Sequence, residues 1–73
     1  MNTKRNITAD TPFQALGTTI AFYTANGGEL YFSVDGVNYS AYEETIEADT
    51  NVFVNGVIPG MYFKFNSDIT AKF

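Results

Sequence analysis

The sequence feature that most constrains the fold is an Asp-Gly pair, Asp35-Gly36, that joins two runs of alternating side chains. Asp-Gly between such runs is the strongest short-range signal for a β-hairpin. A two-residue turn at this pair would place Val34 opposite Val37. Phe32 and Tyr39 would then face each other on the same side of the sheet, because side chains two residues apart along a strand share a face. We therefore predict a hairpin centred on this pair.

A second turn signal precedes this hairpin. Residues 18–24 alternate with the period of a strand, and Ala-Asn-Gly at residues 25–27 interrupts the alternation. A short loop that ends in glycine is a common hairpin connection, and here it would place Phe22 opposite Leu30. The prediction is an antiparallel meander of about three strands over residues 18–42, with one apolar face.

The second half of the chain has the same character. Residues 51–57 and 61–65 alternate, and a Pro-Gly pair typical of a turn lies between them. A short polar loop would then pair residues 61–65 with residues 69–73. Between the two halves, residues 43–50 are rich in Asp and Glu and predict either one helical turn or a loop that crosses between sheets.

Two antiparallel sheets, each with one apolar face, can cover both faces only by packing on each other about 10 Å apart. We therefore predict an all-β fold, a small antiparallel β-sandwich or flattened barrel of about six to seven strands. Residues 18–73 would form this single domain. Residues 1–17 have no sustained period and predict an N-terminal arm with a short strand near residues 7–9, or else a frayed terminus.

Composition limits how such a fold can be stabilised. The chain has 73 residues, and a domain of that size buries only about 60% of the surface that its unfolded chain exposes. Small domains commonly add disulfides, metal ions or subunit assembly, but this sequence contains no Cys and no His. It is rich in Phe and Tyr, and we predict that it assembles as a homo-oligomer.

The charge and hydropathy of the chain argue against some partners. A net charge of −4 disfavours nucleic acid, whose phosphates require clustered Lys and Arg. No apolar run approaches the ~20 residues of a membrane span, and Met1 is followed by polar residues rather than by a signal-peptide core. We expect synthesis in a cytosol, with exit from the cell only as part of an assembled particle.

Side chains suited to catalysis or to a cofactor are scarce. General acid–base catalysis mostly uses His, which is absent, and Ser33 and Ser40 have no base of the expected type. Glu44, Glu47 and Asp49 could offer oxygens to a calcium ion, but their spacing matches no calcium loop. We predict a protein without enzymatic activity, metal or cofactor.

One candidate interface is a group of tyrosines. The predicted registers place Tyr23, Tyr31 and Tyr42 on the outer face of the first sheet, among Ser, Thr and Asn. Rigid amphipathic rings with small polar neighbours are typical of surfaces that bind proteins or sugars. The alternative is that Tyr is simply a favoured strand residue on a half-wet face.

A second candidate interface lies on the outer face of the other predicted sheet. It consists of Phe53, Val57 and Tyr62 beside Lys64 and Lys72. Exposed apolar groups that cluster on a small domain usually mark contact with another protein, and we predict a subunit contact here. A strand register shifted by one residue would instead turn Phe53 inward.

Two stretches carry a resemblance to known families. They are residues 31–39 (Tyr-Phe-Ser-Val-Asp-Gly-Val-Asn-Tyr) and residues 55–65 (Asn-Gly-Val-Ile-Pro-Gly-Met-Tyr-Phe-Lys-Phe). A Ser-x-Asp-Gly hairpin followed by a Pro-Gly turn into an aromatic strand resembles small immunoglobulin-like and fibronectin-like sandwiches. It also resembles short structural proteins of tailed-bacteriophage virions, such as head-decoration and head-fibre proteins. The chain departs from the fibronectin-like pattern in being shorter and in lacking Trp.

This resemblance implies a non-enzymatic virion protein, made in the host cytoplasm, that decorates a capsid or forms part of a fibre. Its partners would be further copies of itself and a capsid or fibre protein. Lys4 and Arg5 in the arm would contact an acidic neighbour or add a strand to it. Two other functions stay open: a carbohydrate- or surface-binding module that uses the tyrosines, and a small acidic inhibitor of a host enzyme.

Overall fold

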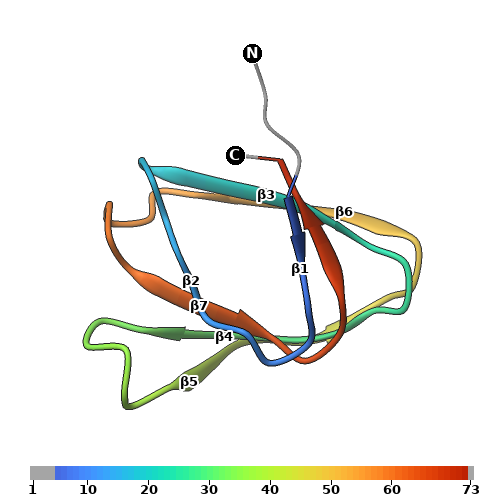
Figure 1. The fold of residues 1–73 in the computed structure, drawn as a ribbon, viewed down its shortest axis with the longest axis horizontal. Helices are drawn as coiled ribbons and strands as arrows, with labels where there is room; N and C mark the ends of the chain where they lie inside the picture. Colours follow the sequence, from blue (N-terminus) through green and yellow to red (C-terminus); the bar gives the residue numbers. More distant parts are fainter. Residues whose placement is uncertain (1–4, 73) are drawn as a thin grey trace.

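The computed structural model describes residues 5–72, which form eight strands and no helix (Figure 1). The strands are β1 (Arg5–Ile7), β2 (Phe13–Gln14), β3 (Thr19–Thr24), β4 (Gly28–Ser33), β5 (Ser40–Ile46), β6 (Thr50–Asn55), β7 (Tyr62–Phe65) and β8 (Ile69–Ala71). The described part of the chain therefore holds no helix long and apolar enough to cross a membrane.

The strands form two sheets that pack on each other. One sheet has the order β1-β8-β3-β6, the other has the order β2-β7-β4-β5, and all neighbouring strands are antiparallel. The prediction of a small all-β antiparallel sandwich is confirmed, with eight strands in place of about six to seven. The predicted change of sheet between the two halves is also confirmed, because β5 and β6 belong to different sheets. Residues 43–46 continue β5, so they form neither a helical turn nor a loop.

The core lies between the sheets and consists of alternate residues from their facing sides. Ile20 and Phe22 of β3, Leu30 of β4, and Phe63 and Phe65 of β7 are all at most 1% exposed. The rings of Phe22 and Phe65 meet across the two sheets with centroids 5.2 Å apart. Full burial of one such side chain contributes about 1.5–3 kcal/mol. These positions are the inner-facing ones that the alternation predicted.

The N-terminal segment belongs to the sandwich. Within residues 5–17, β1 pairs with β8 in one sheet and β2 pairs with β7 in the other. Phe13 and Ala15 are buried in the core, so no boundary at residue 17 separates an arm from a domain in the described part of the chain. Arg5, expected in an extended arm that contacts a neighbouring protein, lies in the β1–β8 ladder, and Lys4 lies outside the described residues.

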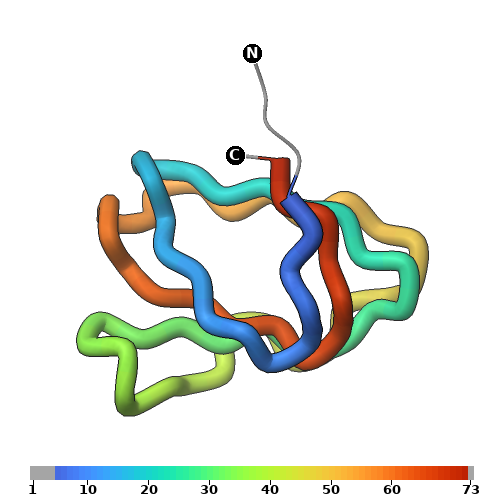
Figure 2. Tube along the Cα trace, in the orientation of Figure 1, coloured from blue at the N-terminus to red at the C-terminus, as the bar shows by residue number. Residues whose placement is uncertain are grey.

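The Asp-Gly pair does not form the predicted two-residue turn. Residues 34–39 join β4 to β5 as a longer loop, which projects at the periphery of the molecule (Figure 2, green). Phe32 pairs with Ser40 rather than with Tyr39. Val34, which was expected to pair across a strand ladder, is 75% exposed.

The side chain of Asp35 accounts for this longer loop. Its Oδ1 accepts hydrogen bonds from the backbone N–H groups of Asn38 and Val37 at 2.9 and 2.8 Å. The Ser33 hydroxyl donates to the same oxygen at 2.8 Å. These donors hold the pKa of the Asp35 carboxyl well below its usual value. An Asp side chain that bonds the backbone two and three residues on builds a local turn that competes with the tight hairpin.

The predicted meander over residues 18–42 and the predicted pairing of residues 61–65 with residues 69–73 are both wrong, because one turn in each crosses between the sheets instead of closing a hairpin. Residues 25–27 take the chain from β3 to β4, and residues 66–68 take it from β7 to β8, each time into the other sheet. The two turns support each other. The Ser67 hydroxyl donates to the Gly27 carbonyl at 2.6 Å, and the Gly27 N–H donates to Thr24 Oγ1 at 2.9 Å. The predicted end of the last strand, residue 73, lies outside the described residues.

Candidate functional site

The three tyrosines predicted to share one face lie on two sheets. Tyr23 is on β3, whereas Tyr31 and Tyr42 are on β4 and β5 of the other sheet. The Tyr31 hydroxyl donates to Glu29 Oε1 at 2.8 Å, and this bond to a carboxylate raises the pKa of Tyr31. The Tyr42 ring packs edge-on against Phe32 with centroids 6.2 Å apart, and Phe32 itself packs against the core. The three rings therefore form no common platform.

The second predicted group is divided as well. Phe53 of β6 is 67% exposed, in agreement with the prediction, but Val57 is only 8% exposed. The alternation stops where β6 ends, because Gly56 adopts a φ of +80° and turns the chain. The Val57 N–H then donates to the Thr18 carbonyl at 2.9 Å, which holds this residue in the core. Tyr62 lies on β7 in the opposite sheet.

The loop over residues 34–39 covers part of the sheet that contains Tyr62. A Cβ on Gly36 would lie 3.1 Å from the Tyr62 ring, so the backbone passes directly over it. Lys64 Nζ lies 4.5 Å from the centroid of the Tyr39 ring, a cation–π distance. Tyr62 and Lys64 are thus both half-buried, and this part of the predicted interface contacts the protein's own loop.

An exposed apolar surface lies at one end of β5 instead. We name it the apolar edge surface; its members are Phe32, Val34, Tyr42, Ile58 and Met61. A groove of about 270 Å³ runs between β5 and the segment after β6, and Phe32, Tyr42, Ile58 and Met61 line it. A second hollow of about 210 Å³ joins Val34 to Ile58 and Met61. Tyr42 and Ile58 are 52% and 63% exposed.

The strand beside this surface is an edge. β5 has seven residues, all exposed except the last, and among residues 5–72 it pairs only with β4 (Figure 1). The pairing passes from Ala41 opposite Tyr31 to Glu43 opposite Leu30, so Tyr42 occupies an irregularity in the ladder. The far side of such a strand presents backbone N–H and C=O groups that another strand can pair with.

The same edge is acidic. Glu43 and Glu44 lie on β5 and Glu47 follows it, while residues 6–63 contain no Lys or Arg. Glu43 and Glu47 line a hollow of about 340 Å³ between β5 and β6, together with Val52. Along the open side of the sandwich, the apolar groups near Tyr42 are therefore followed by the carboxylates of Glu43 and Glu47.

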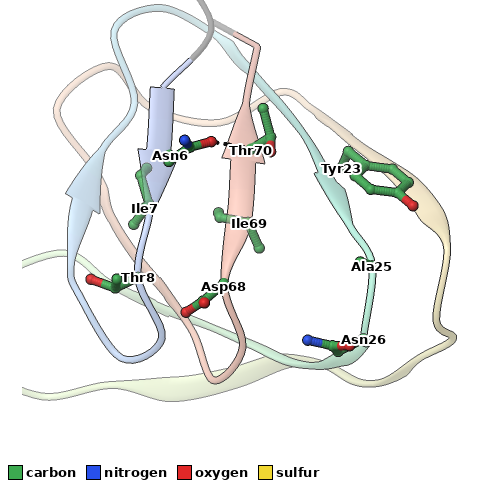
Figure 3. A pocket seen from close by; sticks show the side chains of 9 residues that line it. All are labelled: Asn6, Ile7, Thr8, Tyr23, Ala25, Asn26, Asp68, Ile69 and Thr70. Atoms are coloured by element: carbon green, nitrogen blue, oxygen red, sulfur yellow. Dashed lines mark hydrogen bonds between the residues drawn. The ribbon is translucent and has the colours of Figure 1, made fainter.

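A second, more polar groove lies on the other sheet, where β1, β8 and β3 run side by side (Figure 3). Its volume is about 400 Å³. The strand registers place Asn6, Thr70 and Tyr23 in one row across these three strands. The lining residues are Asn6, Ile7, Thr8, Tyr23, Ala25, Asn26, Asp68, Ile69 and Thr70.

Hydrogen bonds hold the side chains of this polar groove in place. The Tyr23 hydroxyl donates to Asp49 Oδ1 at 2.5 Å, and this bond raises the pKa of Tyr23. Asp68 Oδ1 accepts the Ala9 N–H at 2.8 Å. The groove thus combines one oriented ring with amide, hydroxyl and carboxylate groups, and none of its lining residues is cationic.

The acidic segment does not converge on a metal. Within the part of the chain that the structure describes, no group of three or more His, Cys, Asp or Glu side chains could hold an ion. Of the residues considered for calcium, Asp49 bonds the Tyr23 hydroxyl instead. Of the serines, Ser33 serves the 34–39 loop through its bond to Asp35.

Of the apolar edge surface, sequence reasoning identified only Tyr42 as an interface residue; it predicted that Phe32 and Val34 pair within the hairpin, and it missed Ile58 and Met61. A signal was present, because both flank the Pro59-Gly60 turn, where large apolar residues are unusual. What places them beside Tyr42 is the turn after β6, which the alternation did not predict.

Comparison of the chain with protein-family models, with curated proteins and with solved structures gave no match.

Proposed function

We propose that this protein is a non-enzymatic structural protein that acts through contacts with other protein subunits. One observation carries the proposal: Val34, Tyr42 and Ile58 of the apolar edge surface stay exposed although the core is already filled by other large side chains. Covering one large apolar side chain completely contributes about 1.5–3 kcal/mol. A partner that covered Tyr42, Ile58 and Val34 together would gain several such increments.

The assembly that we propose is a virion of a tailed bacteriophage, formed in the host cytoplasm. The resemblance of residues 31–39 and 55–65 to head-decoration and head-fibre proteins supports it. The small core supports it too, because a domain of this size benefits from assembly in the absence of disulfides. The partners would be further copies of the chain and a capsid or fibre protein.

Mass measurement at several protein concentrations tests the proposal. We expect a closed oligomer that dissociates in a Val34→Asp variant, because this substitution puts a charge into the part of the apolar edge surface that lies outside the groove beside β5. Leu16→Asp is the matched control, since Leu16 is 72% exposed but lines a different groove. A monomer at every concentration would overturn self-assembly, and an oligomer equally sensitive to both variants would show that the apolar edge surface is not the contact.

The polar groove around Tyr23 supports a second candidate, carbohydrate binding. An aromatic ring with neighbouring amides and carboxylates matches the apolar face and the hydroxyl groups of a sugar. Screening a glycan array with the wild type and with Tyr23→Ala would test it. Tyr31→Ala is the control, because Tyr31 lies on the other sheet. Glycan binding that is lost only in Tyr23→Ala supports this function, and absence of any signal eliminates it.

A further inference from the structure

We propose that the open side of the sandwich along β5 receives an extended segment of a different protein, in which an apolar side chain is followed two and four residues later by Lys or Arg. This inference rests on the proposed function, because it names the partner chemistry of the same surface. The segment would pair with the free edge of β5, place an apolar side chain beside Tyr42 and Ile58, and bring its cations to Glu43 and Glu47.

The edges of the two sheets differ in how much backbone they offer. β1 has three residues and β2 has two, which is too short to template another strand. β6 also lies at a sheet edge, has six residues and contributes Val54 and Asn55 to the same groove, but it carries no Asp or Glu that could attract a cation. β5 combines seven exposed or half-exposed residues with the 270 Å³ groove. Pairing of an extended segment with such an edge is a common mode of peptide recognition.

The groove provides the apolar half of the recognition. It is floored by Phe63, which is 1% exposed, and walled by Tyr42 and Ile58, which are both more than half exposed. A side chain that entered it would contact the core through the floor and would remove the two walls from water. One aliphatic or aromatic side chain of the partner would therefore act as the anchor.

Charge provides the other half and argues against a second copy of this chain in the slot. Glu43, Glu44 and Glu47 lie on or next to β5, whereas the side chains of Lys64 and Lys72 contact the Tyr39 ring and the Asn51 amide. Antiparallel pairing of β5 with another β5 would bring these carboxylates together, and like charges across a ladder are destabilising. A segment with Lys or Arg would neutralise them and would also be steered toward the edge by the net charge of −4.

The arrangement also sets the spacing of the partner motif. Tyr42 and Glu43 both border the open side because the ladder is irregular between Ala41 and Glu43. Side chains of an added strand share a face every second residue. The anchor and the first cation should therefore be separated by one residue or by three.

Peptide binding tests this inference directly. The probe is the peptide Thr-Leu-Thr-Lys-Thr-Arg-Thr, titrated into the full chain by calorimetry. We expect a Kd of about 10⁻⁵ to 10⁻⁴ M, slower amide exchange at residues 40–46, and weaker binding at high salt. Two control peptides are used: one with Glu at both cationic positions, and one with N-methylated backbone nitrogens that cannot pair with an edge strand.

Variants of the protein locate the site. In the double variant Glu43→Gln/Glu47→Gln we expect the Kd to rise by about threefold to thirtyfold, because two exposed ion pairs are lost. Ile58→Asp should weaken peptide binding, because it removes the apolar wall that the anchor side chain contacts. Leu16→Asp should leave peptide binding unchanged. Equal binding of the acidic peptide, amide protection at β6 in place of β5, or no binding at about 1 mM peptide would overturn the inference.

The outcomes separate this inference from the proposed function. An oligomer that dissociates in Val34→Asp but binds no cationic peptide would overturn the inference and leave the structural role in place. A monomer that binds the peptide at β5 would support the inference and would exclude self-assembly as the role of this surface.

Discussion

The crossing turn between β3 and β4 offers a sharp test of what makes this chain a sandwich. Thr24 is fully buried, and its Oγ1 accepts the N–H of Gly27, which is also buried, at 2.9 Å. A Thr24→Val substitution keeps the shape of the side chain and removes the acceptor. The Gly27 N–H then loses its partner in a place where water cannot replace it.

The magnitude follows from that burial. A buried donor left without a partner costs about 1–3 kcal/mol, whereas the total stability of a domain of 73 residues is about 4–11 kcal/mol. For a small protein, urea lowers stability by about 1–1.5 kcal/mol per molar. We therefore expect the urea midpoint of Thr24→Val to fall by about 0.7–3 M.

The assay is equilibrium unfolding in urea followed by circular dichroism. Thr19→Val is the matched control on the same strand, because among residues 5–72 its hydroxyl makes no hydrogen bond in the structure, and its midpoint should change little. Equal midpoints for Thr24→Val and the wild type would refute the argument that this buried bond stabilises the crossing.

Three further predictions concern the loop, the polar groove and the N-terminus. The pKa of Asp35 is lower in the folded than in the unfolded protein, so its carboxylate contributes stability above the unfolded-state pKa of about 4, and this contribution is lost as the pH falls through the folded-state value. Urea unfolding between about pH 5 and pH 2 should show this loss of stability. In Asp35→Asn the loss of stability over the same pH range should be smaller. The raised pKa of Tyr23 should shift one tyrosine titration upward in an ultraviolet pH titration, and Asp49→Asn should return it toward the usual value. Deletion of residues 2–8, which removes β1 from its ladder with β8, should lower the melting temperature by at least about 5 °C; an unchanged melting temperature would restore the arm hypothesis.

The candidate site was predictable only in part. The exposure of Phe53 followed from the alternation in β6. The burial of Val57 did not, because Gly56 turns the chain and breaks the period one residue earlier. The apolar edge surface depends on Tyr42 and Ile58 meeting across the open side of the sandwich, and no local pattern relates two residues that lie in different parts of the chain.

The amino-acid sequence by itself determined the all-β class and the inner-facing residues of the strands, since a period of two is a local property that each strand carries alone. The tertiary structure decided which strands pair. A short Gly-containing or Asn-containing turn can close a hairpin or cross to a second sheet while keeping the same side chains inward, and the choice depends on contacts between distant turns, such as the bond from Ser67 to the Gly27 carbonyl. It likewise decided the loop at Asp35, where side-chain hydrogen bonds outweighed the tight turn that its neighbours favoured.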